Sequence, residues 1–175
     1  DNPDDGRVQE SEWRKAMANL RDAITNCSRC GLENFLDPHG PNGQGAEQCW
    51  NCGAGLTDQA RLTVEGIRGR VVALNADTYL FPHHIDGDRY NFRQPVALVD
   101  RHPHHPDVWG LKNLSGATWK AITPDDKRGD VPPGKSVTLA PGVRIRFGSL
   151  TGVIGGRVVA GGNLPPPGSS LDSEQ

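Results

Sequence analysis

The first apolar pattern along the chain has the period of a helix. Five residues near the N-terminus recur at helical spacing on one face: Trp13, Ala16, Met17, Leu20 and Ile24. Ser11 stands where an N-cap would be, so the pattern predicts a helix of about 13 residues that ends near Thr25. Because so short a helix is marginal in water, we expect its apolar face to pack on the segment that follows or on another domain.

From residue 60 onward the pattern changes to alternation with period two. Short runs of this kind, separated by Gly, Pro, Asp and Asn clusters, are typical of an antiparallel β-sandwich or barrel. The strands are expected within residues 60–66, 69–81, 89–92, 95–100, 109–114, 118–122, 136–140, 143–148 and 152–160. No helical period of useful length appears after residue 60, and the Pro- and Ser-rich residues 163–175 are typical of a disordered tail.

Composition supports a β-rich, loop-rich chain. Hydrophobic residues make up 35% of the sequence and aromatic residues 6%, with 22 glycines and 14 prolines. The formal net charge of −2 gives no general attraction to nucleic acid or to an anionic membrane. No run of about 18 apolar residues predicts a membrane span. The sequence does not begin with Met, and we expect it to be a piece of a longer protein.

Two Cys-x-x-Cys pairs carry the clearest chemistry in the sequence. Cys27 and Cys30 are separated by 18 residues from Cys49 and Cys52, which is the spacing of a zinc ribbon. Four thiolates complete a tetrahedral shell around Zn²⁺ and leave no position for a reactive water, so the predicted role is structural. Two disulfides or a redox-active pair are the alternatives, but four cysteines are sparse for a disulfide scaffold.

The predicted ribbon spans residues 27–56. Phe35, Leu36 and Trp50 are its expected small core, and His39 is expected to be an exposed loop residue and not a ligand. Arg29 is its one basic residue, set against three acidic ones, so the charge disfavours binding to phosphates. The domain organisation is therefore a linker and helix in residues 1–26, the ribbon in 27–56, a β-sandwich in 57–162 and the tail in 163–175.

The last strands resemble those of a forkhead-associated (FHA) domain. The resemblance rests on WGLKNLSGATW, on PPGKSVTL and on a closing pattern made by Leu139, Gly142, Val143, Ile145, Phe147 and Gly148. A helix with a Trp, a CxxC–CxxC ribbon and a forkhead-like sandwich, in that order, resemble the C-terminal region of certain bacterial serine/threonine kinases. The resemblance implies a cytoplasmic, noncatalytic regulatory module that recruits a protein partner or kinase substrate.

The chain departs from the phosphothreonine clamp of that family. Pro82 and His83 stand where a Gly-Arg pair would be, and SGAT replaces the Asn-Gly-Thr turn. No Ser or His precedes Ala97 in the segment that would match Ser-Arg-x-His-Ala. A degenerate interaction domain is therefore expected. A true phosphothreonine-peptide reader and a nucleic-acid-binding ribbon are the alternatives, separable by phosphopeptide titration and by salt-dependent nucleic-acid binding.

The remaining candidate residues lie in turns of the expected sandwich. His83 and His84, and a second group of His102, His104 and His105, could bind a metal, make loop hydrogen bonds or be exposed. Trp119 is expected either in the core or as an exposed anchor, and the same holds for Trp109. Asn113 and Ser115 are expected on an apical loop. The loops around His83, His84, Asn113, Ser115 and Trp119 form the predicted partner-binding end. No arrangement of nucleophile and base predicts an enzyme.

Overall fold

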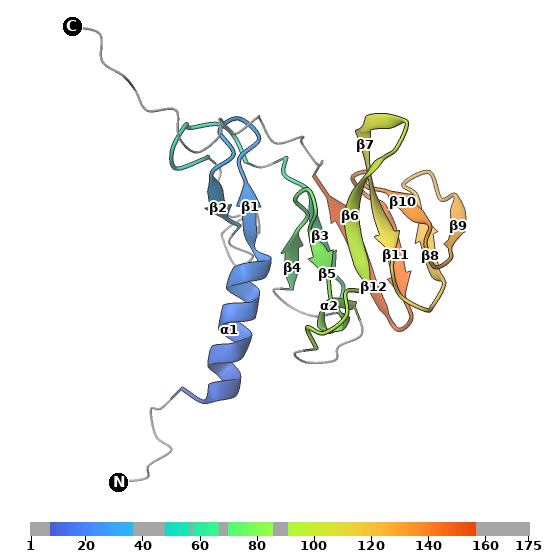
Figure 1. The fold of residues 1–175 in the computed structure, drawn as a ribbon, viewed down its shortest axis with the longest axis horizontal. Helices are drawn as coiled ribbons and strands as arrows, with labels where there is room; N and C mark the ends of the chain where they lie inside the picture. Colours follow the sequence, from blue (N-terminus) through green and yellow to red (C-terminus); the bar gives the residue numbers. More distant parts are fainter. Residues whose placement is uncertain (1–7, 37–47, 57, 67–69, 86–90, 157–175) are drawn as a thin grey trace, which may run out of the picture.

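A computed structural model describes residues 8–36, 48–56, 58–66, 70–85 and 91–156. Figure 1 shows an N-terminal helix and a small two-stranded hairpin beside a body made of two sheets. His39 and the predicted tail, residues 163–175, lie outside the described residues. No helix within the described ranges is long and apolar enough to cross a membrane. The prediction of a mainly β protein with a short N-terminal helix is confirmed.

The helix α1 spans Glu10–Asp22 and has the predicted length of 13 residues. Its N-cap is Gln9 and not Ser11, and the Glu12 carboxylate accepts a hydrogen bond from the Gln9 backbone N–H at 2.9 Å. The helix ends at Asp22, before the predicted end near Thr25, because Ile24 already belongs to the strand β1. β1 (Ile24–Asn26) pairs antiparallel with β2 (Glu33–Phe35).

Two antiparallel sheets make up the rest of the described fold. One sheet has the order β10-β7-β6-β5, formed by β5 (Tyr79–Leu80), β6 (Ala97–His102), β7 (His105–Asn113) and β10 (Ser136–Thr138). The other has the order β4-β3-β12-β11-β8-β9, formed by β3 (Arg61–Val64), β4 (Val71–Ala73), β8 (Trp119–Ile122), β9 (Arg128–Val131), β11 (Arg144–Phe147) and β12 (Leu150–Gly155). The short helix α2 (Pro82–Ile85) follows β5.

The two sheets enclose one hydrophobic core. Val99 and Leu111 of the four-stranded sheet share it with Leu62 and Ile145 of the six-stranded sheet, and all four are fully buried. Trp119 also lies in this core and packs edge-to-face on Phe147. Successive side chains of a strand point to opposite faces, so one face of each sheet supplies the core and the other faces outward.

Several expected strands differ from those observed. The single strand predicted within 69–81 is observed as two, β4 and β5, because the chain turns between them and Asp77 there has a φ of 60°. Asn91 and Phe92 are not in a strand, whereas His105 and Pro106, expected in a turn, begin β7. The polar segment Arg128–Val131 gave no alternating signal, yet it forms β9 by pairing along β8.

Asn113 is the polar centre of one end of the sandwich. Its side-chain N–H groups donate to the carbonyls of Ala117 and Val131, each at 2.8 Å, and its Oδ1 accepts bonds from the backbone N–H and hydroxyl of Ser115. The Trp119 indole N–H then donates to the same Ser115 hydroxyl at 3.1 Å. A fully buried amide thus has its hydrogen-bonding capacity used by the protein.

We predict that Asn113→Ala lowers the free energy of unfolding by about 3 kcal/mol, because it leaves the buried Val131 carbonyl without its side-chain donor and removes the bonds to Ala117 and Ser115. Chemical denaturation measures this change. Lys120→Ala is the matched control, since Lys120 is exposed and forms only a surface ion pair with Asp130. It should cost at most about 0.5 kcal/mol. Equal effects of the two substitutions would contradict the structural role given to Asn113.

Candidate metal centre and the helix junction

Two similar turns bring the four cysteines together. In each turn the glycine after the second cysteine has a positive φ, 74° at Gly31 and 69° at Gly53. The backbone N–H of Gly31 donates to the Cys27 carbonyl at 2.8 Å, and that of Gly53 to the Cys49 carbonyl at 2.9 Å. Because glycine adopts this conformation without strain, both thiols of each pair can face one point.

The sulfur geometry fits a tetrahedral ion. The Cys27 and Cys52 Sγ atoms are 3.6 Å apart, as are those of Cys30 and Cys49, and all four lie within 4.8 Å of one another. A tetrahedral metal with bonds of about 2.3 Å to sulfur requires sulfur atoms about 3.8 Å apart. All four cysteines are free thiols. The predicted ligand set can therefore hold a metal ion.

The thiols differ in how easily they ionise. Backbone N–H groups of Cys52 and Asn51, together with the Asn34 side chain, lower the pKa of Cys49 to about 6. A hydrogen bond from the Ala54 backbone favours the Cys52 thiolate, but burial and the three neighbouring thiols outweigh it and raise the pKa of Cys52 to about 11. Four negative sulfurs so close together repel one another, and a bound cation removes that repulsion.

Sulfur also replaces the expected aromatic core of the ribbon (residues 24–36 and 48–56). Cys27, Cys49 and Leu56 form its buried cluster. The prediction that Phe35 and Trp50 fill this core is wrong, because they are 41% and 71% exposed. The Trp50 indole N–H instead donates to the Glu33 carbonyl at 2.8 Å, which leaves its ring at the surface.

Leu36 has a different role from the one predicted. It is buried with Ala23, at the end of α1, and with Ala73 of β4, so it joins helix, ribbon and sandwich. Beside it, Asn75 reaches across to β1. Its amide donates to the Ile24 carbonyl at 2.9 Å, and its Oδ1 accepts the Asn26 backbone N–H at 3.0 Å. We call these contacts, together with those of Asp22 described next, the junction.

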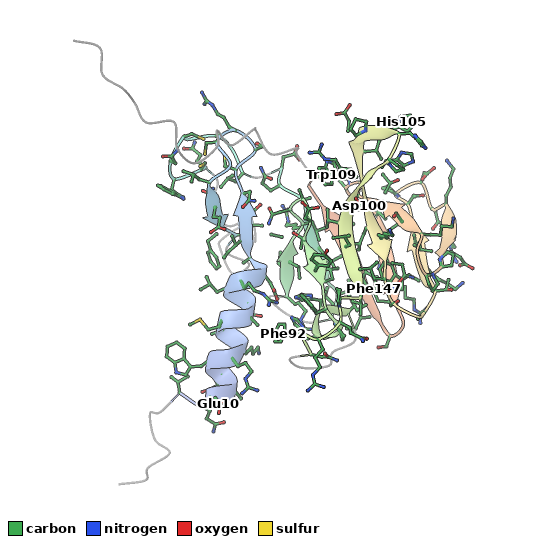
Figure 2. The ribbon with its side chains drawn as sticks, in the orientation of Figure 1. Glu10, Phe92, Asp100, His105, Trp109 and Phe147 are labelled. Carbon is green, nitrogen blue, oxygen red and sulfur yellow. The ribbon has the colours of Figure 1, made fainter. Side chains whose placement is uncertain are left out.

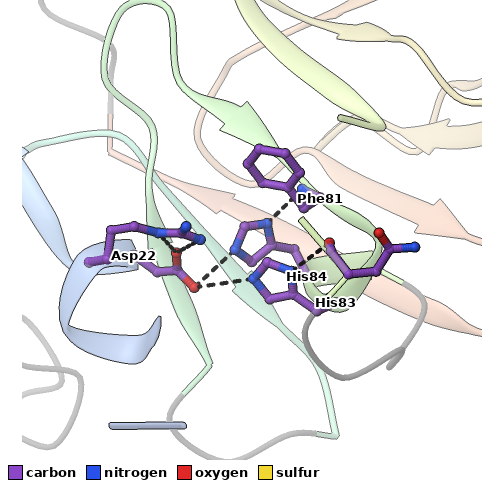
Figure 3. Close-up of polar contacts among 6 residues, drawn as sticks. Asp22, Phe81, His83 and His84 are labelled. Carbon is purple, nitrogen blue, oxygen red and sulfur yellow. Dashed lines mark hydrogen bonds and ion pairs between the residues drawn. The ribbon is translucent and has the colours of Figure 1, made fainter. Parts of the chain in front are cut away.

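Asp22 links the end of α1 to α2 (Figure 3). His84 Nε2 lies 2.9 Å and His83 Nε2 3.9 Å from Asp22 Oδ2, while Arg21 binds the other carboxylate oxygen at 3.0 Å. Burial favours the neutral acid, but the two histidines and Arg21 outweigh it and hold the pKa of Asp22 well below its usual value. Burial lowers the pKa of His84 despite the attraction of Asp22.

The predicted partner-binding residues lie at one end of the sandwich, yet they are not a polar recognition surface. Sheet register aligns Leu80, Ala97 and Asn113, so His83 and Asn113 belong to the same end. Their side chains are buried, however, as are those of His84 and Trp119. The Ser115 hydroxyl donates a hydrogen bond to Asn113 Oδ1 within the fold. The sequence offered no signal for Asp22 and Asn75, which lie alone in segments without a motif.

One face of α1 is apolar and exposed. Trp13, Met17 and Leu20 are 54%, 53% and 46% exposed, and we call these three residues the outward stripe. An α-helix turns by about 100° per residue, so Trp13, nine positions before Asp22, lies on the opposite side of the helix. Met17 and Leu20 fall within about 40° of the same direction. The prediction that this face packs on the ribbon is wrong.

A groove of about 600 Å³ lies along the four-stranded sheet and is lined by residues of β6, β7 and β10. Its floor is low because Gly110 has no side chain, and a Cβ there would come within 3.1 Å of Ser136 Cβ. Lys112 and Arg101 supply positive charge, and the Arg101 guanidinium lies 4.6 Å from the centre of the Trp109 ring. Figure 2 labels Trp109 and Asp100 in this region and His105 at the hairpin tip.

Removal of the metal should unfold the ribbon and leave the sandwich folded, since the ribbon interior is made of sulfur whereas the sandwich has its own core. A chelator strong enough to strip the thiolate site should collapse the amide dispersion of residues 24–36 and 48–56 in ¹H–¹⁵N NMR spectra. Amides of β7, β8 and β11 should keep their positions. Cys49→Ser should reproduce the effect, and a ribbon spectrum that survives chelation would contradict it.

The sequence matches no family model, no curated protein and no solved structure. The geometry of the thiolate cluster, the junction, the outward stripe and the groove therefore carries the functional argument.

Proposed function

We propose that this chain is a noncatalytic protein-interaction module, stabilised by zinc, that docks a partner protein on the outward stripe of α1. The observation that carries the proposal is the orientation of that helix. Its polar end contacts the sandwich through Asp22, and its apolar residues face away from the described fold. An amphipathic helix with an unused apolar face is a common recognition element for hydrophobic grooves.

The energetics favour a partner for this face. Each of Trp13, Met17 and Leu20 leaves about half of its surface in water. Covering that surface is worth on the order of 1 kcal/mol per residue, and an aromatic anchor such as Trp13 contributes more than its share at protein interfaces. Exposed apolar residues at consecutive turns of one helix form a patch, and patches of this kind mark interaction sites.

Zinc is the ion we propose for the thiolate site. Soft sulfur donors in tetrahedral geometry select Zn²⁺ over harder cations, and a complete protein shell suits a structural role. Among the described ribbon residues Arg29 and Glu33 offset each other, and four thiolates around Zn²⁺ leave the site itself with a charge of about −2. That balance supports protein binding over nucleic-acid binding.

The proposed setting is the cytoplasmic C-terminal region of a bacterial serine/threonine kinase. Support comes from the order of helix, ribbon and sandwich and from the forkhead-like pattern around Val143 and Phe147. A reducing compartment would also keep the four cysteines as thiolates for the metal. In such a protein the module would recruit a substrate or regulator, and the chemistry would belong to another domain.

Introduction of negative charge into the outward stripe should abolish partner binding without unfolding the module. We expect the variant Trp13→Glu/Leu20→Glu to lose, by at least about tenfold, a partner that the unmodified chain captures from its source cells. Quantitative mass spectrometry and a binding titration with the identified partner measure the loss. The matched control is Lys15→Glu, which changes the charge of the same helix on the face toward Asp22.

Three outcomes of that experiment decide the proposal. Partner loss in the stripe variant with retention in the Lys15→Glu control supports it. Equal capture by both variants contradicts it. A monomer–dimer equilibrium that disappears with the stripe would mean that the face pairs with a second copy of the chain, which sedimentation velocity detects.

Phosphothreonine-peptide recognition is the second candidate function, and the groove beside Trp109 favours it. Lys112 lies next to Ser136 in the sheet register, so an ammonium and a hydroxyl can approach one phosphate. Arg101 adds a guanidinium, although Asp100 also lines the groove and reduces the net positive charge. This site uses residues of the four-stranded sheet and none of the loop positions where the forkhead clamp is missing.

Titration with phosphothreonine peptides tests the second candidate. If it holds, binding should require the phosphate, weaken with salt, and fall at least about tenfold in Lys112→Ala. Lys120→Ala on the other sheet provides the control, because it removes the same charge outside the groove. Phosphate-independent binding, or equal affinities of the two variants, would exclude phosphopeptide reading by the groove.

A further inference from the structure

The junction contains a second group of metal-ligating side chains. Asp22, His83 and His84 place one ligand atom each within 4.8 Å of one another, from segments about 60 residues apart in the sequence. His83 and His84 are only 6% and 1% exposed. Phe92 packs against His83, with ring centres 4.5 Å apart, and shields the group from water, so charges there interact more strongly than at the surface.

His84 is a hydrogen-bond donor in this group. Its Nδ1 accepts the Phe81 backbone N–H at 2.9 Å, so the ring proton must reside on Nε2. That proton points to Asp22 Oδ2 at 2.9 Å. His84 therefore orients the carboxylate, as the outer partners of ligating carboxylates do in metal sites.

His83 has the opposite arrangement. Its Nδ1 lies 3.4 Å from the Asn91 carbonyl oxygen, which can only accept, so Nδ1 carries the ring proton. Nε2 is left with a lone pair, and among the described residues no hydrogen-bond partner reaches this buried atom. It faces Asp22 Oδ2 at 3.9 Å. In this neutral tautomer a lone pair of Nε2 and one of the carboxylate face each other in the interior, whereas a protonated ring would donate to Asp22 and lower its pKa.

A cation between these two atoms, either a proton on Nε2 or a metal ion, removes the repulsion. The 3.9 Å separation is too long for a hydrogen bond. It is within half an ångström of the spacing, about 3.4 Å, between nitrogen and oxygen ligands of a tetrahedral ion with bonds of about 2.0–2.1 Å. Nitrogen and carboxylate ligands suit Zn²⁺ and similar transition-metal ions.

We propose that Asp22 and His83 bind a second divalent transition-metal ion, with His84 and Arg21 holding the carboxylate in place. Two protein ligands leave positions for water, so this ion exchanges more readily than one held by four thiolates. Arg21 on the other carboxylate oxygen weakens the site further, because it lowers the local negative charge. The bound ion would tether α1 to α2 and so fix the direction of the outward stripe.

Titration of Co²⁺ into chain whose thiolate site is already filled with Zn²⁺ tests the proposal. The unmodified chain should bind about one further equivalent, with visible d–d bands and without the thiolate charge-transfer band. Asp22→Asn and His83→Gln should each weaken this binding at least about tenfold. His104→Gln is the control, because it removes an exposed histidine from the hairpin cluster and leaves the junction intact.

Every outcome bears on the site. No second equivalent in the unmodified chain, or loss of it in His104→Gln alone, overturns the proposal. Histidine ¹⁵N shifts of the unmodified chain give a test that does not depend on the variants folding. Addition of Zn²⁺ should shift His83 Nε2 from a bare to a ligated nitrogen, and a proton found on that atom at neutral pH overturns the proposal as well.

Discussion

The buried carboxylate of Asp22 is the constraint that sets how the parts of this protein are arranged. A carboxylate that is only 11% exposed is costly unless donors surround it, and here His84 and Arg21 supply them. These contacts hold α1 with Asp22 toward the sandwich. Trp13, Met17 and Leu20 lie on the side of the helix opposite Asp22. The contact that docks α1 therefore also directs these three residues away from the fold.

The ribbon depends on the junction in a different way. Its interior is sulfur and one leucine, so a bound metal would supply the cohesion that a larger apolar core gives. Its position, however, comes from Leu36 against Ala73 and from Asn75 along β1. The cysteines are therefore the residues that can bind a metal, whereas Leu36 and Asn75 determine where the ribbon lies relative to the sandwich. A metal at the four cysteines would fold the ribbon, whereas contacts with the sandwich orient it.

Sequence patterns predicted those features that residues close together in the chain determine. The Cys-x-x-Cys spacing identified the thiolate cluster, and period-two alternation located most strands, because both depend on neighbouring residues. The direction of the α1 apolar face could not be predicted, since it follows from one contact between residues 62 apart. Asn113 was expected on an exposed loop for a similar reason. Its burial depends on Val131, in a strand that has no alternating pattern of its own.

Occupancy of the junction and exposure of the stripe are linked through the same helix. An ion that binds only the docked arrangement stabilises it by about 2.7 kcal/mol at a concentration one hundred times its dissociation constant. That is comparable to the cost of separating a small apolar contact such as Ala23, Leu36 and Ala73. A partner that requires the stripe in its docked direction must then bind more tightly when the ion is present. By the same linkage, the partner raises the affinity for the ion by an equal factor.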